Sequence, residues 1–366
     1  MKFKVPKSKL FEALSTVQNV VGAKVAVPVL SNVLIEADEG ALTFTTTDLE
    51  MTMRCSCEAD VKEKGKVTLP VKNLTSIVRE LDDGIVSIEM DEDHVANMRC
   101  GSYKSKINGM SARDFPATPT TESAISYVID QGKFRDMLKK THYAAASDDS
   151  RAVLTGVLLS FENGKLICVA TDGRRLALYE AEVDFPVENN RDIVLPPRAV
   201  AELMRSLGDE GQLKISLKDK QLILEYADMF LCCKLLAGPY PNYKQVVFNN
   251  CSNVITVNRE ELLAVLRRIQ ASTANETNAM RLTFENNILT IAVNSPEIGE
   301  AVDTVAIKYT GEPLTVIFNP KFMRDPLRFL TSDDVQIELN NESSPGLIKS
   351  DIPFLYVIMP LRVNAV

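Results

Sequence analysis

The chain contains three copies of one unit, and this repetition limits its fold more than any other feature of the sequence. Ser31 to Asp48 reads SNVLIEADEGALTFTTTD, and Thr155 to Asp172 reads TGVLLSFENGKLICVATD, 124 positions later and without a gap. Met280 to Ser295 reads MRLTFENNILTIAVNS and repeats the Phe-Glu-Asn of the second copy at an offset of 123. A period of this length is that of a whole domain rather than of a short solenoid repeat.

Each copy has the same predicted order of elements: a short strand, an amphipathic helix, alternating strands, a second helix and closing strands. Asn163-Gly164 lies between two apolar runs and predicts a tight hairpin, and Asp38-Glu39-Gly40 and Asn286-Asn287 stand at its place in the other copies. The fold class is therefore α+β, with two helices against mainly antiparallel sheet in each domain. The expected domains are residues 1–121, 125–248 and 252–366.

The predicted helices share a positive charge. They span residues 7–24, 72–80, 133–143, 198–205, 259–268 and 321–328. In each copy the second helix follows or begins with a proline, which a first helical turn tolerates, and Pro326 inside the last helix is expected to kink or shorten it. All six are net positive and total +10, so the rest of the chain carries −18 of the overall −8. Solvated helix faces often carry Lys and Arg, but six basic helices on an acidic chain favour contact with a polyanion.

Composition indicates an ordered globular protein, with 45% hydrophobic and 25% charged residues. No apolar run reaches the length of a membrane span, and the charged N-terminus does not resemble a signal peptide, so we expect a cytoplasmic protein. The seven cysteines show neither Cys-x-x-Cys spacing nor nearby histidines. We therefore expect neither a metal site nor a disulfide framework.

The stretch VATDGRRLAL, from Val169 to Leu178, is specific to the second copy after its Asp172. Because Thr-Asp is shared with the first copy, we interpret Asp172 as a turn residue and the following Gly-Arg-Arg-Leu as the specialised part. Two other functions fit the same letters. An enzyme acting on a phosphate ester could use Asp172 as acid or base with Arg174 and Arg175 as its clamp, and a purely structural scaffold could use the stretch as a hairpin. The sequence contains no Gly-rich phosphate loop and no His-Glu-x-x-His, which disfavours the enzyme.

Over its whole length the sequence resembles the bacterial DNA polymerase sliding clamp family, the beta subunit of the replicative polymerase. The resemblance is carried by the three copies and by three motifs, VATDGRRLAL, GPYPNYKQVV from Gly238 to Val247, and YVIMPLRV from Tyr356 to Val363. It implies a head-to-tail homodimer that forms a six-domain ring, with helices lining a hole through which duplex DNA passes without sequence specificity. It also implies a non-catalytic processivity factor, without cofactor, that tethers the replicative polymerase, the clamp loader and other proteins carrying a clamp-binding motif.

The resemblance further implies three sets of site residues. A pocket for a partner's short peptide motif would comprise Arg151, Leu154, Thr171, Gly173, Arg174, Arg175, Leu176, Pro241, Val246, Val357, Met359, Pro360, Leu361 and Arg362. Contacts to the DNA backbone would come from Lys24, Lys72, Arg79, Lys133, Arg135, Lys139, Lys140, Arg198, Arg205, Arg267 and Arg268. The dimer interface would pair Lys104, Lys106 and Ile107 with Gln270, Ala271, Glu297, Glu300 and Asp303. Without the resemblance, Val357 to Leu361 would be interpreted as a last core strand.

Overall fold

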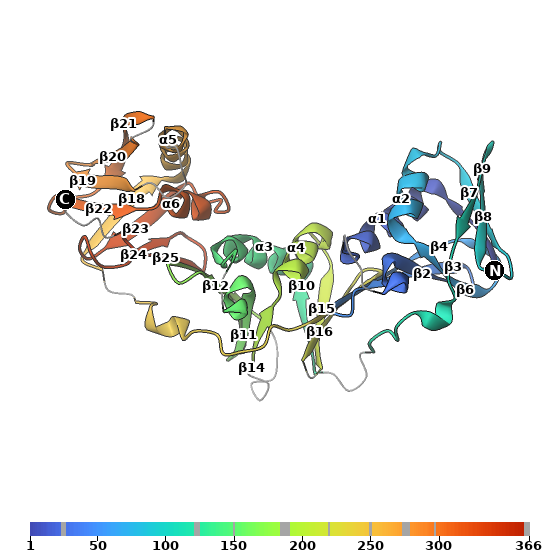
Figure 1. Cartoon of the computed structure of the whole chain (residues 1–366). Helices are drawn as coiled ribbons and strands as arrows, with labels where there is room; N and C mark the ends of the chain where they lie inside the picture. Colours follow the sequence, from blue (N-terminus) through green and yellow to red (C-terminus); the bar gives the residue numbers. More distant parts are fainter. Residues whose placement is uncertain are drawn as a thin grey trace. The chain divides into compact units, whose positions relative to one another are not determined.

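The chain folds into two compact units, each of which is described by itself. The computed structural model describes residues 1–22, 27–120, 125–148, 151–183, 191–218, 220–248, 251–272, 279–295 and 298–361. One unit contains Met1–Lys133 and Ala201–Leu235, and the other contains Phe134–Val200 and Leu236–Val366. The helices and strands are labelled along the chain in Figure 1.

The predicted helices all form, with adjusted ends. Their bounds are α1 (Lys7–Val17), α2 (Val71–Glu80), α3 (Gln131–Thr141), α4 (Pro197–Ser206), α5 (Arg259–Ala271) and α6 (Pro320–Leu327). The first helix is shorter than the predicted 7–24, because β-branched Val17, Val20 and Val21 favour helix weakly; a 3₁₀ turn over Gln18–Val20 follows it. The last helix ends one residue after Pro326 and has 8 residues, against 10 in each of the corresponding helices α2 and α4, as the proline predicts.

The first unit contains two antiparallel sheets. The five-stranded sheet has the order β5-β1-β7-β8-β9, and the eight-stranded sheet has the order β10-β15-β16-β17-β4-β3-β2-β6. Pairing of β17 with β4 joins strands of the second copy to strands of the first copy. The strand bounds are β1 (Lys2–Pro6), β2 (Asn32–Asp38), β3 (Ala41–Thr47), β4 (Met51–Glu58), β5 (Asp60–Glu63), β6 (Gly65–Pro70), β7 (Ile85–Met90), β8 (Val95–Cys100), β9 (Tyr103–Asn108), β10 (Ile125–Asp130), β15 (Gln212–Lys218), β16 (Gln221–Tyr226) and β17 (Met229–Lys234).

The second unit contains one sheet of twelve strands, in the order β14-β11-β12-β13-β25-β24-β23-β18-β21-β20-β19-β22. Its bounds are β11 (Val157–Glu162), β12 (Lys165–Thr171), β13 (Arg175–Glu182), β14 (Arg191–Leu195), β18 (Asn253–Asn258), β19 (Met280–Glu285), β20 (Ile288–Ser295), β21 (Gly299–Lys308), β22 (Leu314–Phe318), β23 (Asp334–Leu339), β24 (Gly346–Lys349) and β25 (Phe354–Ile358). Helices α5 and α6 pack against each other (Figure 1). Leu176 of β13 pairs with Val357 of β25, so the copy-specific stretch of the second copy lies beside the last strand of the third.

The hairpins form where the turn residues predict them. Asn163 and Gly164 both have positive φ, 52° and 77°, as a two-residue hairpin turn requires. Asn286 and Asn287 adopt the same conformation, at 51° and 61°. The repeated sequence pattern therefore corresponds to a repeated backbone.

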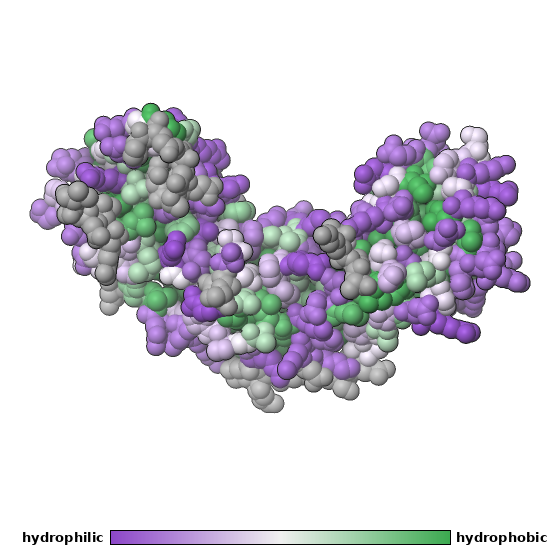
Figure 2. All heavy atoms as spheres, in the orientation of Figure 1, coloured by the Kyte–Doolittle hydropathy of each residue, from purple (hydrophilic) through white to green (hydrophobic). Residues whose placement is uncertain are grey.

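Hydrophilic residues cover most of the surface visible in Figure 2, and hydrophobic residues appear there in smaller patches. Among the described residues, no helix is both long and apolar enough to span a membrane.

Candidate functional site

A cavity of about 160 Å³ lies over β13 and β25 in the second unit, and we call it the β13–β25 pocket. It is lined by Arg151, Leu154, Thr171, Gly173, Arg174, Arg175, Leu176, Pro241, Asn242, Tyr243, Val246, Val357 and Met359. Most of the residue set predicted for a peptide pocket is thus brought together from segments far apart in the sequence. Pro360 and Leu361 follow the end of β25 and do not line the cavity, and Arg362 lies outside the described residues.

Two lining residues, Asn242 and Tyr243, were absent from the predicted set. Both belong to the GPYPNYKQVV motif, so the sequence contained the signal. Tyr243 begins a 3₁₀ turn that ends at Gln245, which places its ring against the sheet and leaves Val246 exposed. The connection between the second and third copies therefore forms one wall of the pocket.

A tight turn built by Thr171 and Asp172 forms the rim. Asp172 Oδ1 accepts hydrogen bonds from the backbone N–H groups of Arg174 and Arg175 at 2.9 and 3.0 Å. The Thr171 hydroxyl donates to the Arg175 carbonyl at 2.6 Å, and Gly173 takes the left-handed φ of 84° that favours glycine. The interpretation of Asp172 as a turn residue is confirmed.

The first copy makes the same turn, which identifies it as shared scaffold. Asp48 Oδ1 accepts from the N–H groups of Glu50 and Met51, at 3.0 and 2.7 Å, and Leu49 has a φ of 74° at the position of Gly173. Met51 is buried at the position that Arg175 occupies in the second copy. The second copy has thus replaced a buried apolar side chain by a buried arginine.

Apolar side chains form the floor and one edge of the pocket. Leu154, Leu176 and Val357 are buried, whereas Val246 and Met359 are 42% and 41% exposed. Large apolar side chains exposed beside a concave apolar floor are typical of a protein interaction site. The pocket can therefore take a partner's aliphatic or aromatic side chain.

The two adjacent arginines have different environments. Arg174 is exposed at the rim, but Arg175 is only 7% exposed. Arg175 donates from Nε to Asp172 Oδ2 at 3.0 Å, from Nη1 to Asp325 Oδ2 at 2.5 Å and from Nη2 to the Tyr143 carbonyl at 2.6 Å. The predicted role of both arginines as ligands for a partner's acceptors therefore fits Arg174 and does not fit Arg175, whose hydrogen bonds are made within the chain.

The surroundings of Arg175 keep its guanidinium protonated. Burial alone would lower the pKa of the guanidinium, but the carboxylates of Asp325 and Asp172 raise it above its ordinary value. The guanidinium carbon also lies 4.3 Å from the centre of the Phe322 ring. Arg175 is therefore a permanent buried cation that joins β13 to helix α6.

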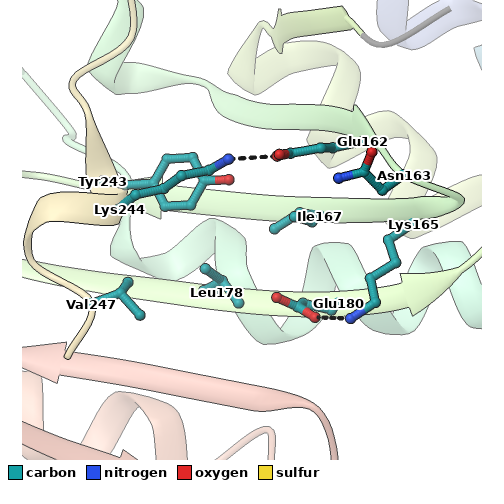
Figure 3. Close-up of a pocket in the computed structure, with 9 residues that line it drawn as sticks. All are labelled: Glu162, Asn163, Lys165, Ile167, Leu178, Glu180, Tyr243, Lys244 and Val247. Carbon is teal, nitrogen blue, oxygen red and sulfur yellow. Dashed lines mark hydrogen bonds and ion pairs between the residues drawn. The ribbon is translucent and has the colours of Figure 1, made fainter. Parts of the chain in front are cut away.

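A second cavity, of about 440 Å³, is also lined by Tyr243 (Figure 3). Its apolar part consists of Ile167, Leu178, Tyr243 and Val247. Two ion pairs cross its rim, Lys244 to Glu162 at 2.6 Å and Lys165 to Glu180 at 3.0 Å, and both are drawn in Figure 3. The lysines are matched by carboxylates, so this cavity has no excess charge of either sign.

The described residues that are predicted to contact DNA lie on or beside helices, and all of them except Lys140 are exposed or half-buried. Those that are exposed are Lys72, Arg79, Lys133, Arg198, Arg205, Arg267 and Arg268, and Arg135 and Lys139 are half-buried. Lys24 lies outside the described residues.

Lys140 is buried, and this environment does not suit a phosphate contact. Its ammonium group pairs with Asp136 one turn earlier on α3 and lies 5.3 Å from the centre of the Tyr179 ring. Lys140 is therefore poorly suited to the predicted DNA contact, because a phosphate would have to displace Asp136 from a buried ammonium.

Some exposed basic residues already have partners within the chain. Lys72 donates to the Gly22 carbonyl at 2.8 Å, Arg205 pairs with Glu202, and Arg268 pairs with Asp303 at 2.7 Å. The Arg268–Asp303 pair is largely exposed and therefore weak, so Arg268 can exchange its partner at low cost, whereas Arg205 is held by a buried carboxylate.

The residues predicted for a dimer interface lie at two sheet margins. Lys104, Lys106 and Ile107 are on β9, the end strand of the five-stranded sheet. Glu300 and Asp303 are on β21, which pairs with β18 only at Lys308 and Ile307; from Gly299 to Ala306 its second edge pairs with no described strand.

The third-copy residues of this predicted interface have different environments. Ala271 is exposed at the end of α5, Gln270 accepts a hydrogen bond from Arg324, and Glu297 lies outside the described residues. Asp303 is engaged by Arg268, and that hydrogen bond lowers the pKa of its carboxyl. Within the described chain, Asp303 therefore has an internal partner before any second copy is considered.

No cluster of three or more His, Cys, Asp or Glu side chains in the described residues could hold a metal ion. The seven cysteines are free thiols, and burial raises the pKa of Cys55 to about 12 and of Cys57 to about 11. These thiols are protonated at neutral pH, which makes them poor nucleophiles and poor metal ligands.

Three copies of an α+β unit, with a preformed apolar pocket where two copies meet, define a multidomain binding protein. Comparison with known proteins identifies the family. Family models for the N-terminal, central and C-terminal domains of the DNA polymerase III beta subunit match residues 1–119, 128–242 and 244–362. The chain belongs to the DNA polymerase III beta subunit family, whose members are non-catalytic processivity factors.

Relatives match over the full length. The beta sliding clamp of Chlamydia trachomatis is 33% identical over 364 residues, covering 100% of this chain and 88% of that protein. The beta sliding clamp of Bacillus subtilis is 27% identical over 376 residues, covering 99% of this chain and 100% of that protein.

Solved structures agree with the fold. A Pseudomonas aeruginosa sliding clamp bound to griselimycin superposes with a TM-score of 0.94 at 29% identity, covering 99% of this chain and 100% of that chain. A Bacillus subtilis DNA polymerase sliding clamp superposes with a TM-score of 0.95 at 26% identity, covering 100% of both chains.

Proposed function

We propose that the protein is a DNA sliding clamp, formed by two copies joined head to tail into a six-domain ring in the cytoplasm. The ring encircles duplex DNA without reading its sequence and tethers the replicative polymerase, which gives replication its processivity. Family membership supports this function. The observation in the chain itself that carries the tethering role is the β13–β25 pocket.

The pocket suits a short linear motif with one or two large apolar side chains. Its floor is apolar and includes Leu176 and Val357, which face each other on paired strands, while Met359 at the edge adapts to different shapes. Arg174 at the rim offers a charge to acidic or carbonyl groups of the partner. The replicative polymerase, the clamp loader and other proteins with such a motif would compete for this site, and Pro360 and Leu361, which follow β25, would extend it.

DNA contact is assigned to the basic side chains on the helices. Sliding requires attraction to phosphates without hydrogen bonds to base edges, and exposed Lys and Arg on helical surfaces provide it. Arg267 on α5 and Lys139 on α3 are the most suitable for testing, because neither forms an ion pair with any residue that the structure describes. Lys140 is not among these contacts, because its buried ammonium pairs with Asp136.

Ring closure is assigned to the two sheet margins. The unpaired edge of β21 and the end strand β9 each present backbone N–H and C=O groups, and edge strands of two copies can complete one another. Lys104 and Lys106 on one margin are complementary in charge to Glu300 on the other. Asp303 would contribute after exchanging Arg268 for a lysine of the second copy.

Two measurements test this function together. Sedimentation velocity at micromolar concentration should give a mass of about twice 40.5 kDa. Isothermal calorimetry should detect a polymerase-derived clamp-binding peptide at one site per chain. A strictly monomeric protein would contradict the ring, and an absence of peptide binding would contradict the tethering role.

A further inference from the structure

Asp325 is a buried carboxylate outside the β13–β25 pocket. It lies on α6, is 6% exposed, and is 2.5 Å from Arg175 Nη1, with Arg324 at 3.9 Å on its other oxygen. A buried charge of this kind is tolerated only when it is paired and hydrogen-bonded. Its position opposite Arg175 is therefore fixed by electrostatics.

Arg175 connects Asp325 to the rim of the pocket. The arginine lines the pocket and also lines a separate cavity of about 640 Å³ to which Asp325 and Asp172 belong. Its Nε–H group holds Asp172 Oδ2, while Asp172 Oδ1 accepts from the N–H groups of Arg174 and Arg175. The guanidinium thus fixes the carboxylate that shapes the rim turn.

The rim turn in turn fixes the third-copy edge of the pocket. The carbonyl of Arg174 accepts a hydrogen bond from the backbone N–H of Met359 at 2.9 Å. A continuous series of contacts therefore runs from Asp325 through Arg175 and Asp172 to Arg174 and Met359. Every link in this series is a hydrogen bond or ion pair of 3.0 Å or less.

We infer that Asp325 is a positioning residue for the β13–β25 pocket: it holds Arg175, and through it the rim turn and Met359, in the conformation that binds a partner's motif. This inference rests on the proposed function and adds a residue that does not touch the ligand. Without the Asp325 charge, the rim samples other conformations, and apparent affinity falls in proportion to the fraction that remains competent. Coupling of this kind between a remote residue and a site changes affinity by about 3- to 30-fold.

The test compares Asp325→Asn with a control in the same repeat. Glu338 is also buried and is paired with Lys349 at 2.8 Å, but it does not line the pocket. Both Asp325→Asn and Glu338→Gln should lower the melting temperature. At a temperature where both are fully folded, calorimetry with a polymerase-derived peptide should show weaker binding for Asp325→Asn and unchanged binding for Glu338→Gln.

The route through Arg175 is tested by a double-mutant cycle. In an Arg175→Ala background, Asp325→Asn should cause no further loss of peptide affinity; if that background does not fold, Asp172→Asn replaces it. If Asp325→Asn itself does not fold, Phe322→Leu removes the ring beneath the guanidinium more gently and should weaken binding in the same direction.

The outcomes separate this inference from the proposed function. Wild-type affinity in folded Asp325→Asn, or an equal loss in Glu338→Gln, overturns the positioning role alone. A further full loss in the Arg175→Ala background overturns the route through Arg175. Failure of the unaltered protein to bind the peptide overturns the proposed function and this inference with it.

Discussion

Replacing Arg175 by alanine should destabilise the second unit strongly, because its buried guanidinium makes its hydrogen bonds within the chain. The change removes three hydrogen bonds and leaves Asp325 as a buried carboxylate whose remaining ion-pair partner among the described residues is Arg324, at 3.9 Å. Removing one partner of a buried ion pair costs about 3–5 kcal/mol, because the remaining charge is left uncompensated. For a folding unit of about 150–250 residues this corresponds to a fall in melting temperature of roughly 6–20 °C.

The assay is differential scanning calorimetry of Arg175→Ala beside Arg174→Ala. Arg174 is the matched control because it is the same residue type, one position earlier, and exposed. Its replacement should change the free energy of unfolding by no more than about 0.5 kcal/mol. Arg175→Lys should lie between the two, since a single ammonium cannot reach Asp172, Asp325 and the Tyr143 carbonyl in the fork geometry of a guanidinium. Equal melting temperatures for the two alanine variants would refute the assignment of Arg175 as a buried clamp.

Three further predictions follow from the site and its surroundings. Met359→Ala should weaken the binding of a polymerase-derived peptide by roughly 1–2 kcal/mol in calorimetry. Met51→Ala should leave the peptide affinity unchanged and lower the stability of the protein, because Met51 is buried in the first copy. An equal loss of affinity in both variants would contradict the location of the pocket. Lys139→Glu with Arg267→Glu should make the salt dependence of DNA binding shallower by about 1 in slope for each phosphate contact removed, and an unchanged slope in fluorescence anisotropy would exclude them as contacts. Burial lowers the pKa of His142 in the folded protein below 6.5, so the unfolded state takes up a proton first as the pH falls. The stability of the protein should therefore decrease below about pH 6.5. Thermal melts from about pH 7.5 to 5.5 should show this decrease, and it should be smaller in His142→Gln.

The repeated architecture was predictable because it depends on local signals. Hairpin turns require residues that accept positive φ, and Asn163-Gly164 and Asn286-Asn287 supply them in register. Amphipathic spacing located the helices, and only their ends needed adjustment, as at Val17. These features could be predicted from the sequence because each depends on residues that are close together in it.

The role of Arg175 was not predictable because its partner Asp325 is 150 residues away. Two adjacent arginines after a Gly look equivalent in a sequence, and only the fold decides which one points to solvent. Lys140 is different, because Asp136 stands four residues before it on a predicted helix and indicated an ion pair. That signal favoured an internal role over a DNA contact.

The most direct test of the sliding-clamp function is retention on DNA of different topology. The protein should be loaded with its clamp loader onto a nicked circular plasmid, separated from free protein by gel filtration, and then treated with a restriction enzyme that cuts the plasmid once. A ring that encircles DNA should co-elute with the circle and be released after linearisation, because topology rather than affinity holds it. Equal retention on circular and linear DNA, or no retention on the circle after loading, would contradict encirclement.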